Sequence, residues 1–230
     1  MKTIWETIMK GYLWFIEPVA TLLVKLRINP NTLTTIGTIC TVAGGLAFAL
    51  GHIRTGGLII GITAVFDVLD GTVARRTGQS TVFGAFYDST LDRVADGAVL
   101  GGLAYFYATS PVYHSVPMLG VTLIGIIGTY LVSYTRARAE GLGIDAKVGV
   151  MQRPERVVLL SVPQAFFGVV LNGWVLAGVV SLLALTAWIT AIQRILFVRR
   201  TTLNTIPTPL RVLNDKTPQS ARSASRRAQS

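Results

Sequence analysis

Four aspartates in an apolar part of the chain have the spacing of a metal site. They are Asp67, Asp70, Asp88 and Asp92. Residues three or four apart lie on one face of a helix, so each pair is expected to point in one direction. Carboxylates are costly inside a membrane and usually mark a functional site there. If two facing helices carry the four aspartates, their carboxylates repel one another unless hard divalent cations bind between them. The pattern therefore predicts two Mg²⁺ or Mn²⁺ ions.

Small and basic residues beside the aspartates suit a phosphate ligand. Gly71 has no side chain and lets a phosphate approach the helix backbone, and Ala74 keeps the same face narrow. Arg75, one turn further, can fork onto a pyrophosphate. Gly84 opens room on the facing helix. Either glycine alone could instead serve helix packing, since small residues are common between membrane helices.

The elements that must position these residues are membrane helices. The chain has 230 residues, 51% of them hydrophobic, and a mean hydropathy of +0.55, which is typical of an integral membrane protein. Apolar runs separated by turn residues predict an all-α fold with six transmembrane helices, at about 31–51, 56–76, 82–108, 117–138, 153–171 and 174–198. At ~1.5 Å per residue the aspartates lie roughly 10 to 15 Å from one end of their spans. They therefore need a cavity open to water.

The two ends of the chain differ from the spans. Residues 2–26 mix large apolar side chains with charged ones, which predicts an N-terminal interfacial amphipathic helix. The polar and basic residues after 203 predict a disordered tail. The expected organisation is a juxtamembrane helix over 1–28, a six-helix domain over 29–200 and a basic tail over 201–230.

The distribution of Lys and Arg predicts the orientation. With both termini in the cytoplasm, the outer loops are 52–55, 109–116 and 172–173, and of 21 basic residues only Arg54 falls in them. The positive-inside rule then places both termini and the aspartate site on the cytoplasmic side of a cell membrane. The net charge of +10 reflects this topology and contact with anionic lipid, and it gives no support to nucleic acid as a partner.

The complete motif resembles the signature of the CDP-alcohol phosphotransferase family. Its eight fixed positions are Asp67, Asp70, Gly71, Ala74, Arg75, Gly84, Asp88 and Asp92, and the sequence matches all of them. The resemblance implies that the four aspartates bind the two metals and that Asp92 is also the general base. An acceptor hydroxyl attacks the β-phosphorus of a CDP-linked lipid in this chemistry, and CMP leaves.

The same resemblance implies a set of nucleotide-binding residues. They are Asn31, Thr32, Leu33, Thr34, Asp67, Gly71, Ala74, Arg75 and Thr81. Asn31 stands where the family pattern has an aspartate.

A second, basic cluster indicates the kind of acceptor. It contains Arg136, Arg138, Arg153, Arg156 and Arg194, all near the predicted inner ends of spans four to six. Several arginines around one pocket suit a phosphate dianion, which favours a phosphorylated alcohol. Arginines at inner helix ends can also be simple topology anchors, and this alternative stays open for Arg138 and Arg153.

The surroundings of these arginines resemble the actinobacterial phosphatidylinositol-phosphate synthase branch of the family. That resemblance implies CDP-diacylglycerol and 1D-myo-inositol 3-phosphate as substrates, a homodimer, and Arg136, Arg156 and Arg194 as ligands of the acceptor phosphate. Three alternatives remain. One is a phosphatidylglycerophosphate synthase that uses glycerol 3-phosphate; the others are a polyprenyl transferase and a transporter without enzymatic activity.

Overall fold

The described part of the protein is built from helices. The computed structural model describes residues 16–151 and 153–203, and within these ranges it has no strand. A helix over residues 16–25 precedes α2 (Pro30–Ala49), α3 (Ile53–Arg76), α4 (Val82–Thr109), α5 (Val116–Glu140), α6 (Arg153–Phe166) and α7 (Trp174–Leu203). The all-α class is therefore confirmed for the described residues.

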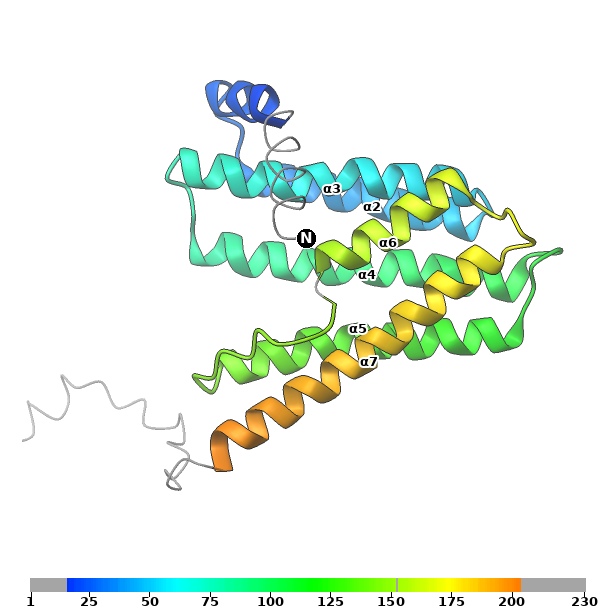
Figure 1. The fold of residues 1–230 in the computed structure, drawn as a ribbon. Coiled ribbons are helices and arrows are strands. Elements are labelled where there is room, and N and C mark those ends of the chain that lie inside the picture. The colour runs from blue at the N-terminus through cyan, green and yellow to red at the C-terminus, as the bar shows by residue number, and fades with distance from the viewer. Residues whose placement is uncertain (1–15, 152, 204–230) are drawn as a thin grey trace, which may run out of the picture.

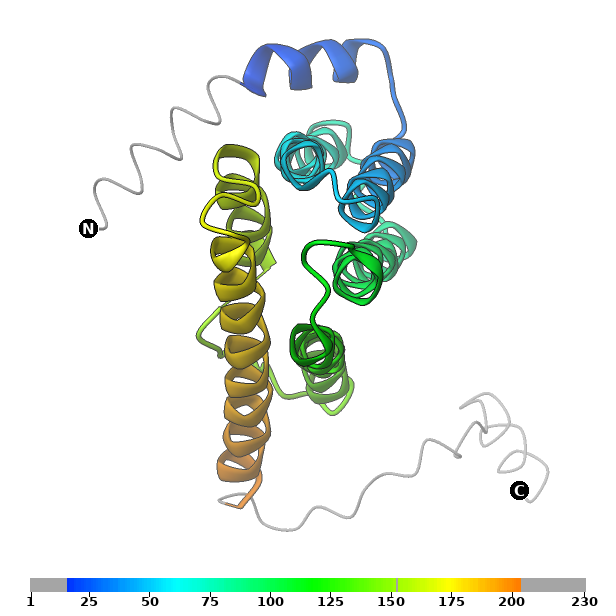
Figure 2. The same ribbon diagram turned by 90° about the vertical axis from the view of Figure 1, so that its right-hand side faces the viewer.

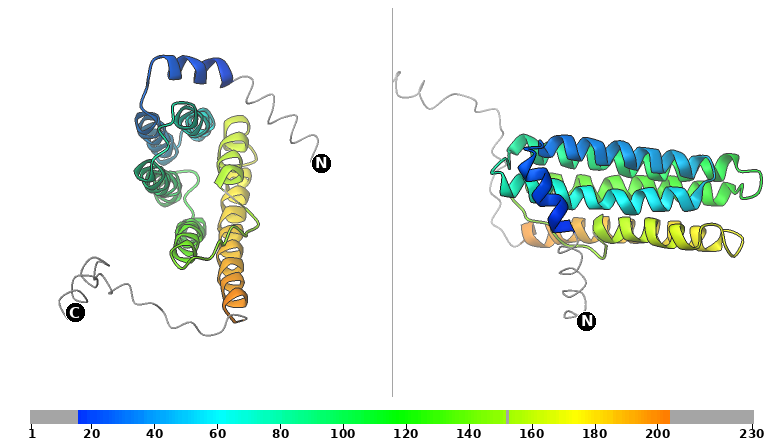
Figure 3. Two further views of the ribbon diagram at one scale, coloured as in Figure 1. Left: turned by 90° about the vertical axis from the view of Figure 1, so that its left-hand side faces the viewer. Right: turned by 90° about the horizontal axis from the view of Figure 1, so that it is seen from above.

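The long helices form two layers. Helices α2 to α5 run along one another, and α6 and α7 cover one side of them (Figure 1). Seen end-on, the first four helices make one layer and the other two make the second (Figures 2 and 3). Helix α2 packs against both α3 and α4, whereas α3 and α4 make no close backbone contact in the described part of the chain. Helix α2 thus connects the two motif-bearing helices, whose backbones stay apart, while Ile60 of α3 and Val99 of α4 share one hydrophobic core.

Capping side chains explain where α2 and α4 begin. Asn29 caps α2, since its side chain accepts a hydrogen bond from the Asn31 amide at 2.9 Å. Thr81 caps α4 in the same way and accepts from the Gly84 amide at 2.9 Å. Such caps satisfy amides that have no partner inside the helix. Gly78, with a φ of +66°, lies in the turn that reverses the chain between α3 and α4.

Two glycines set the close approach of α2 to α4. A Cβ atom on Gly102 would lie 2.0 Å from the carbonyl oxygen of Gly45, and a Cβ on Gly45 would lie 2.5 Å from that of Ala98. Glycines permit such backbone contact between membrane helices. Phe48 and Leu103, both fully buried, fill the core beside this contact. The position of α4, and hence of its aspartates, depends on this packing.

Four of the described helices are long and apolar enough to cross a membrane, judged by length and composition. They are α2, α3, α5 and α7. The structure differs from the predicted fifth span, 153–171, because α6 ends at Phe166 and residues 167–173 form turns. Positive φ angles at Gly168, Leu171, Asn172 and Gly173 explain this early end. The 14 residues of α6 are only about 21 Å long, less than the ~30 Å of a hydrocarbon core.

The helix over residues 16–25 is attached to the end of α3. Ile16 and Ala20 are buried against Leu69, and Arg76 donates to Glu17 at 2.7 Å. This hydrogen bond lowers the pKa of Glu17 below its usual value. Outside the described residues lie the rest of the predicted amphipathic helix and nearly all of the predicted tail. Helix α7 continues to Leu203, past the expected end of the last span.

The α2–α4 contact leads to a prediction for two neighbouring glycines. Gly102→Ala is expected to lower the free energy of unfolding by about 1–3 kcal/mol, because the new methyl group has no room. Gly101→Ala is the matched control, since a Cβ there meets no atom within 4 Å. Thermal unfolding of the purified protein in detergent measures both variants. Equal melting temperatures for the two would contradict this account of the packing.

Candidate active site

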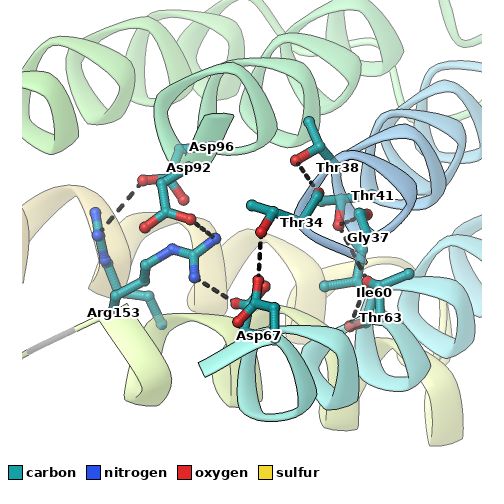
Figure 4. A network of polar contacts seen from close by, with 12 residues as sticks. Thr34, Gly37, Thr38, Thr41, Ile60, Thr63, Asp67, Asp92, Asp96 and Arg153 are labelled. Atoms are coloured by element: carbon teal, nitrogen blue, oxygen red, sulfur yellow. Dashed lines mark hydrogen bonds and ion pairs between the residues drawn. The ribbon is translucent and has the colours of Figure 1, made fainter. Parts of the chain in front are cut away.

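One arginine joins the two aspartate-bearing helices. Arg153, the first residue of α6, contacts Asp67 on α3 through Nη1 and Asp92 on α4 through Nη2, the latter at 2.7 Å (Figure 4). The two carboxylates therefore stabilise a positive charge placed between them. From the sequence, Arg153 is expected either near the acceptor phosphate or as a topology anchor, and its contact with both carboxylates was not predicted.

Asp70 has a different environment from Asp67. It is buried, and the hydroxyl of Thr34 donates to its Oδ2 atom at 2.7 Å. This bond links α2 to α3 at the level of the motif. Thr34 is expected from the sequence to bind the nucleotide; it lines the cavity described below and also donates to a predicted metal ligand.

A cavity of about 200 Å³ opens where α3 ends and α4 begins. It is lined by Pro30, Asn31, Thr34, Asp70, Gly71, Ala74, Arg75, Gln79, Ser80, Thr81, Gly84, Ala85 and Asp88. Most of the predicted nucleotide-binding residues thus share one cavity with two of the predicted metal ligands. The turn residues Gln79 and Ser80 were not predicted to line the site, although their position between the two halves of the motif could have indicated it.

Three predicted nucleotide-binding residues do not line this cavity. Leu33 is buried in the helix packing and Thr32 is exposed. Asp67 lines a second, narrower cavity of about 30 Å³ together with Asp96 and Arg153. That volume has room for about a single water molecule.

The predicted acceptor arginines fall into different environments. Arg156 is buried and contacts Asp96 at 3.5 Å, while its Nε and Nη1 atoms have no hydrogen-bond partner among the described residues. Arg194 is also buried, but its guanidinium donates to the backbone carbonyls of Val132 and Val148. Arg156 therefore has donors that a ligand could use, whereas two donors of Arg194 already tie α7 to its neighbours.

The two remaining arginines of this cluster lie near the end of α5. Arg136 is exposed and pairs with Glu140 at 2.9 Å, and Arg138 is exposed in the last turn of the helix. Arg93, which the sequence analysis did not select, lies within 3.5 Å of Asp92 and 4.0 Å of Asp96. Its position next to Asp92 in the sequence was the available signal.

The donor set suits a hard divalent cation. Within the described ranges, no three His, Cys, Asp or Glu side chains are arranged so that they could hold one metal ion. The predicted ligands are nevertheless four carboxylates, the oxygen donors that Mg²⁺ and Mn²⁺ prefer. The guanidinium of Arg153 is the cation that lies between two of these carboxylates, Asp67 and Asp92. The residues fit such ions chemically, and Arg153 contacts one oxygen of Asp67 and one of Asp92.

Comparison with known proteins identifies the family. Residues 27–198 match the model of the CDP-alcohol phosphatidyltransferase family, so the chain belongs to this family. It is 38% identical over 184 residues to the phosphatidylinositol phosphate synthase of Mycobacteroides abscessus, covering 80% of this chain and 83% of that protein. It is 35% identical to the archaetidylinositol phosphate synthase of Pyrococcus horikoshii, over 78% of this chain and 88% of the other.

Solved structures support the same assignment. The crystal structure of Mycobacterium tuberculosis phosphatidylinositol phosphate synthase with CDP-DAG bound has a TM-score of 0.72 and 34% identity, and the match covers 79% of this chain and 92% of that chain. The structure of the same enzyme with manganese and citrate has the same score and identity, over 79% and 88% of the two chains. The family resemblance found in the motif is therefore confirmed.

The Thr34–Asp70 contact can be tested by removing one hydroxyl. Thr34→Val keeps the shape of the side chain but leaves the buried carboxylate without this donor, which costs about 1–3 kcal/mol of stability. Thr34→Ser retains the hydroxyl and is expected to stay close to the wild type. Thermal unfolding compares the three proteins. A Val variant as stable as the Ser variant would show that the hydrogen bond contributes nothing.

Proposed function

We propose that the protein is a phosphatidylinositol phosphate synthase. It transfers the phosphatidyl group of CDP-diacylglycerol to 1D-myo-inositol 3-phosphate and releases CMP. The observation that carries this proposal is the cavity that joins Asp70, Arg75 and Asp88 at the hairpin of α3 and α4, because it combines acidic ligands with a phosphate-binding group. The M. tuberculosis enzyme with CDP-DAG bound, at 34% identity, supports the lipid donor.

The nucleotide part of the donor binds in this cavity. Arg75 binds the pyrophosphate with its planar guanidinium. Gly71 leaves room for that guanidinium beside the α3 backbone, since a Cβ there would lie 3.3 Å from Nη1 of Arg75. Asn31 and Thr81 offer polar groups from the starts of α2 and α4. Thr34 and Ala74 also line this cavity. Thr32, Leu33 and Asp67, the other residues that the family resemblance assigns to the nucleotide, lie outside it.

Asp92 accepts the proton of the attacking hydroxyl. The acceptor oxygen then forms a bond to the β-phosphorus, the bond from that phosphorus to CMP breaks, and CMP leaves with the electron pair. Asp67, Asp70, Asp88 and Asp92 hold two divalent ions. When bound, these ions neutralise the charge of the pyrophosphate, and manganese in the related M. tuberculosis structure supports this choice of metal.

The acceptor phosphate binds at the arginine cluster. Arg156 contributes the Nε and Nη1 donors that have no partner among the described residues. Arg136 and Arg194 complete the site, with further positive charge from Arg138 and Arg153. A phosphate dianion explains why a buried arginine carries donors without a partner, since such a group is otherwise costly to bury.

The protein is a multi-pass protein of a bacterial cell membrane with six crossings. Besides the four apolar helices, α4 crosses with its carboxylates turned to the site, and α6 crosses together with the turn that follows it. Both termini and the active site are cytoplasmic, and the helix before α2 lies at the interface. The domains are 1–28, 29–200 and 201–230, and two copies form a homodimer.

The acceptor can be identified with one assay. Purified protein with CDP-diacylglycerol and Mg²⁺ is expected to release CMP when inositol 3-phosphate is added, and to release little with glycerol 3-phosphate or without any acceptor. The reason is that productive binding requires two contacts of the acceptor: its phosphate must bind the arginine cluster, and its inositol ring must fit the site. Turnover with glycerol 3-phosphate but not with inositol 3-phosphate would contradict the proposal and favour a phosphatidylglycerophosphate synthase.

The role of Asp92 is tested by Asp92→Asn. Removing a general base lowers turnover by about 10²-fold or more, while binding of CDP-diacylglycerol is expected to be largely retained. Asp145→Asn is a suitable control, because Asp145 is exposed and pairs only with nearby Lys147. CMP release and lipid-donor binding are measured for both variants. Substantial activity of Asp92→Asn would refute the assignment of the base.

A further inference from the structure

Arg153 occupies a position that no other described cation shares. Its two terminal nitrogens reach one carboxylate on α3 and one on α4, and Figure 4 shows the guanidinium between Asp67 and Asp92. Arg93 contacts only carboxylates on its own helix, and Arg156 contacts only Asp96. Among the described residues, Arg153 is therefore the one cation that connects the two halves of the motif.

The contacts of Arg153 use oxygens that a metal would need. They are Oδ2 of Asp67 and Oδ1 of Asp92, and both residues belong to the proposed metal ligands. A divalent cation binds carboxylate oxygens directly. The planar fork of arginine also takes them in a fixed geometry. Arginine and metal thus compete for the same place.

The burial of Arg153 strengthens this competition. Its side chain is 24% exposed, and that of Asp92 is 14% exposed. Charges in such a place need a partner, because an unpaired buried charge is very costly. Without the arginine, the carboxylates of an unloaded site would face one another with no bridging cation between the two helices.

We propose that Arg153 is a positioning residue that holds Asp67 and Asp92 together while the site has no metal, and that metal binding displaces it. The inference rests on the proposed function in that it takes these aspartates as metal ligands. It assigns Arg153 a role apart from the acceptor phosphate: it preserves the spacing of α3 and α4 in the unloaded protein, at the expense of metal affinity.

The experiment is a Mn²⁺ titration of the full-length protein in detergent, without lipid or acceptor. Free Mn²⁺ is followed by electron paramagnetic resonance. Arg153→Met is expected to bind Mn²⁺ about tenfold more tightly than the wild type, since the metal no longer has to break a charge-assisted contact. Arg153→Lys is also expected to bind more tightly, because lysine keeps the charge but cannot fork onto both carboxylates.

A matched control separates this competition from a general effect of charge. Arg156→Met removes the same charge one helix turn away, from an arginine that contacts only Asp96, and is expected to change Mn²⁺ affinity less than twofold. A second measurement is the rise in Tm on adding Mn²⁺, which should be larger for Arg153→Met than for the wild type, since the unloaded variant lacks its bridging cation.

Each other outcome has a definite meaning. Unchanged or weaker Mn²⁺ binding by both Arg153 variants would overturn the proposal. So would an equal gain in Arg153→Met and Arg156→Met, because that result would reflect charge alone. Asp67→Asn tests the underlying function separately: wild-type Mn²⁺ affinity in that variant would remove Asp67 from the metal site itself.

Discussion

Negative charge concentrated in an apolar bundle is the constraint on which this structure depends. Asp67, Asp70, Asp92 and Asp96 are neutralised or hydrogen-bonded by groups from other positions, chiefly Arg153, Thr34 and Arg156. Unpaired carboxylates would cost far more than any local packing could offset. The placement of α2 and α6 beside the two motif-bearing helices can be understood as the way the chain supplies these partners.

Helix packing places the two motif-bearing helices, and Arg153 holds Asp67 and Asp92 together within that frame. Helix α2 contacts both α3 and α4, and the Gly45–Gly102 contact brings α2 and α4 close enough to determine where the α4 aspartates lie. The gap that remains between α3 and α4 becomes the cavity at the hairpin. A rigid frame of this kind allows binding of a charged ligand without rearrangement of the backbone.

Much of the fold and of the candidate site could be predicted from the sequence. Helix periodicity placed the aspartates on two helices, and the family resemblance assigned Asn31, Gly71, Arg75 and Thr81 to one ligand, in agreement with the cavity that they share. Side-chain partners between distant segments could not be predicted in the same way. The contact of Arg153 with Asp67 joins residues 86 positions apart, and the carbonyl contacts of Arg194 depend on how α7 crosses α5. The end of α6 was also missed, although Gly168, with a positive φ two residues past Phe166, was an available signal.

The central claim is that α3 and α4 present their carboxylates to a shared pair of cations. A crystal structure of the protein soaked with Mn²⁺, with anomalous diffraction at the manganese edge, tests it most directly. The account predicts anomalous peaks bounded by Asp67, Asp70, Asp88 and Asp92, with the Arg153 guanidinium moved away from Asp67 and Asp92. Peaks only elsewhere, with Arg153 still bridging the two helices, would contradict it.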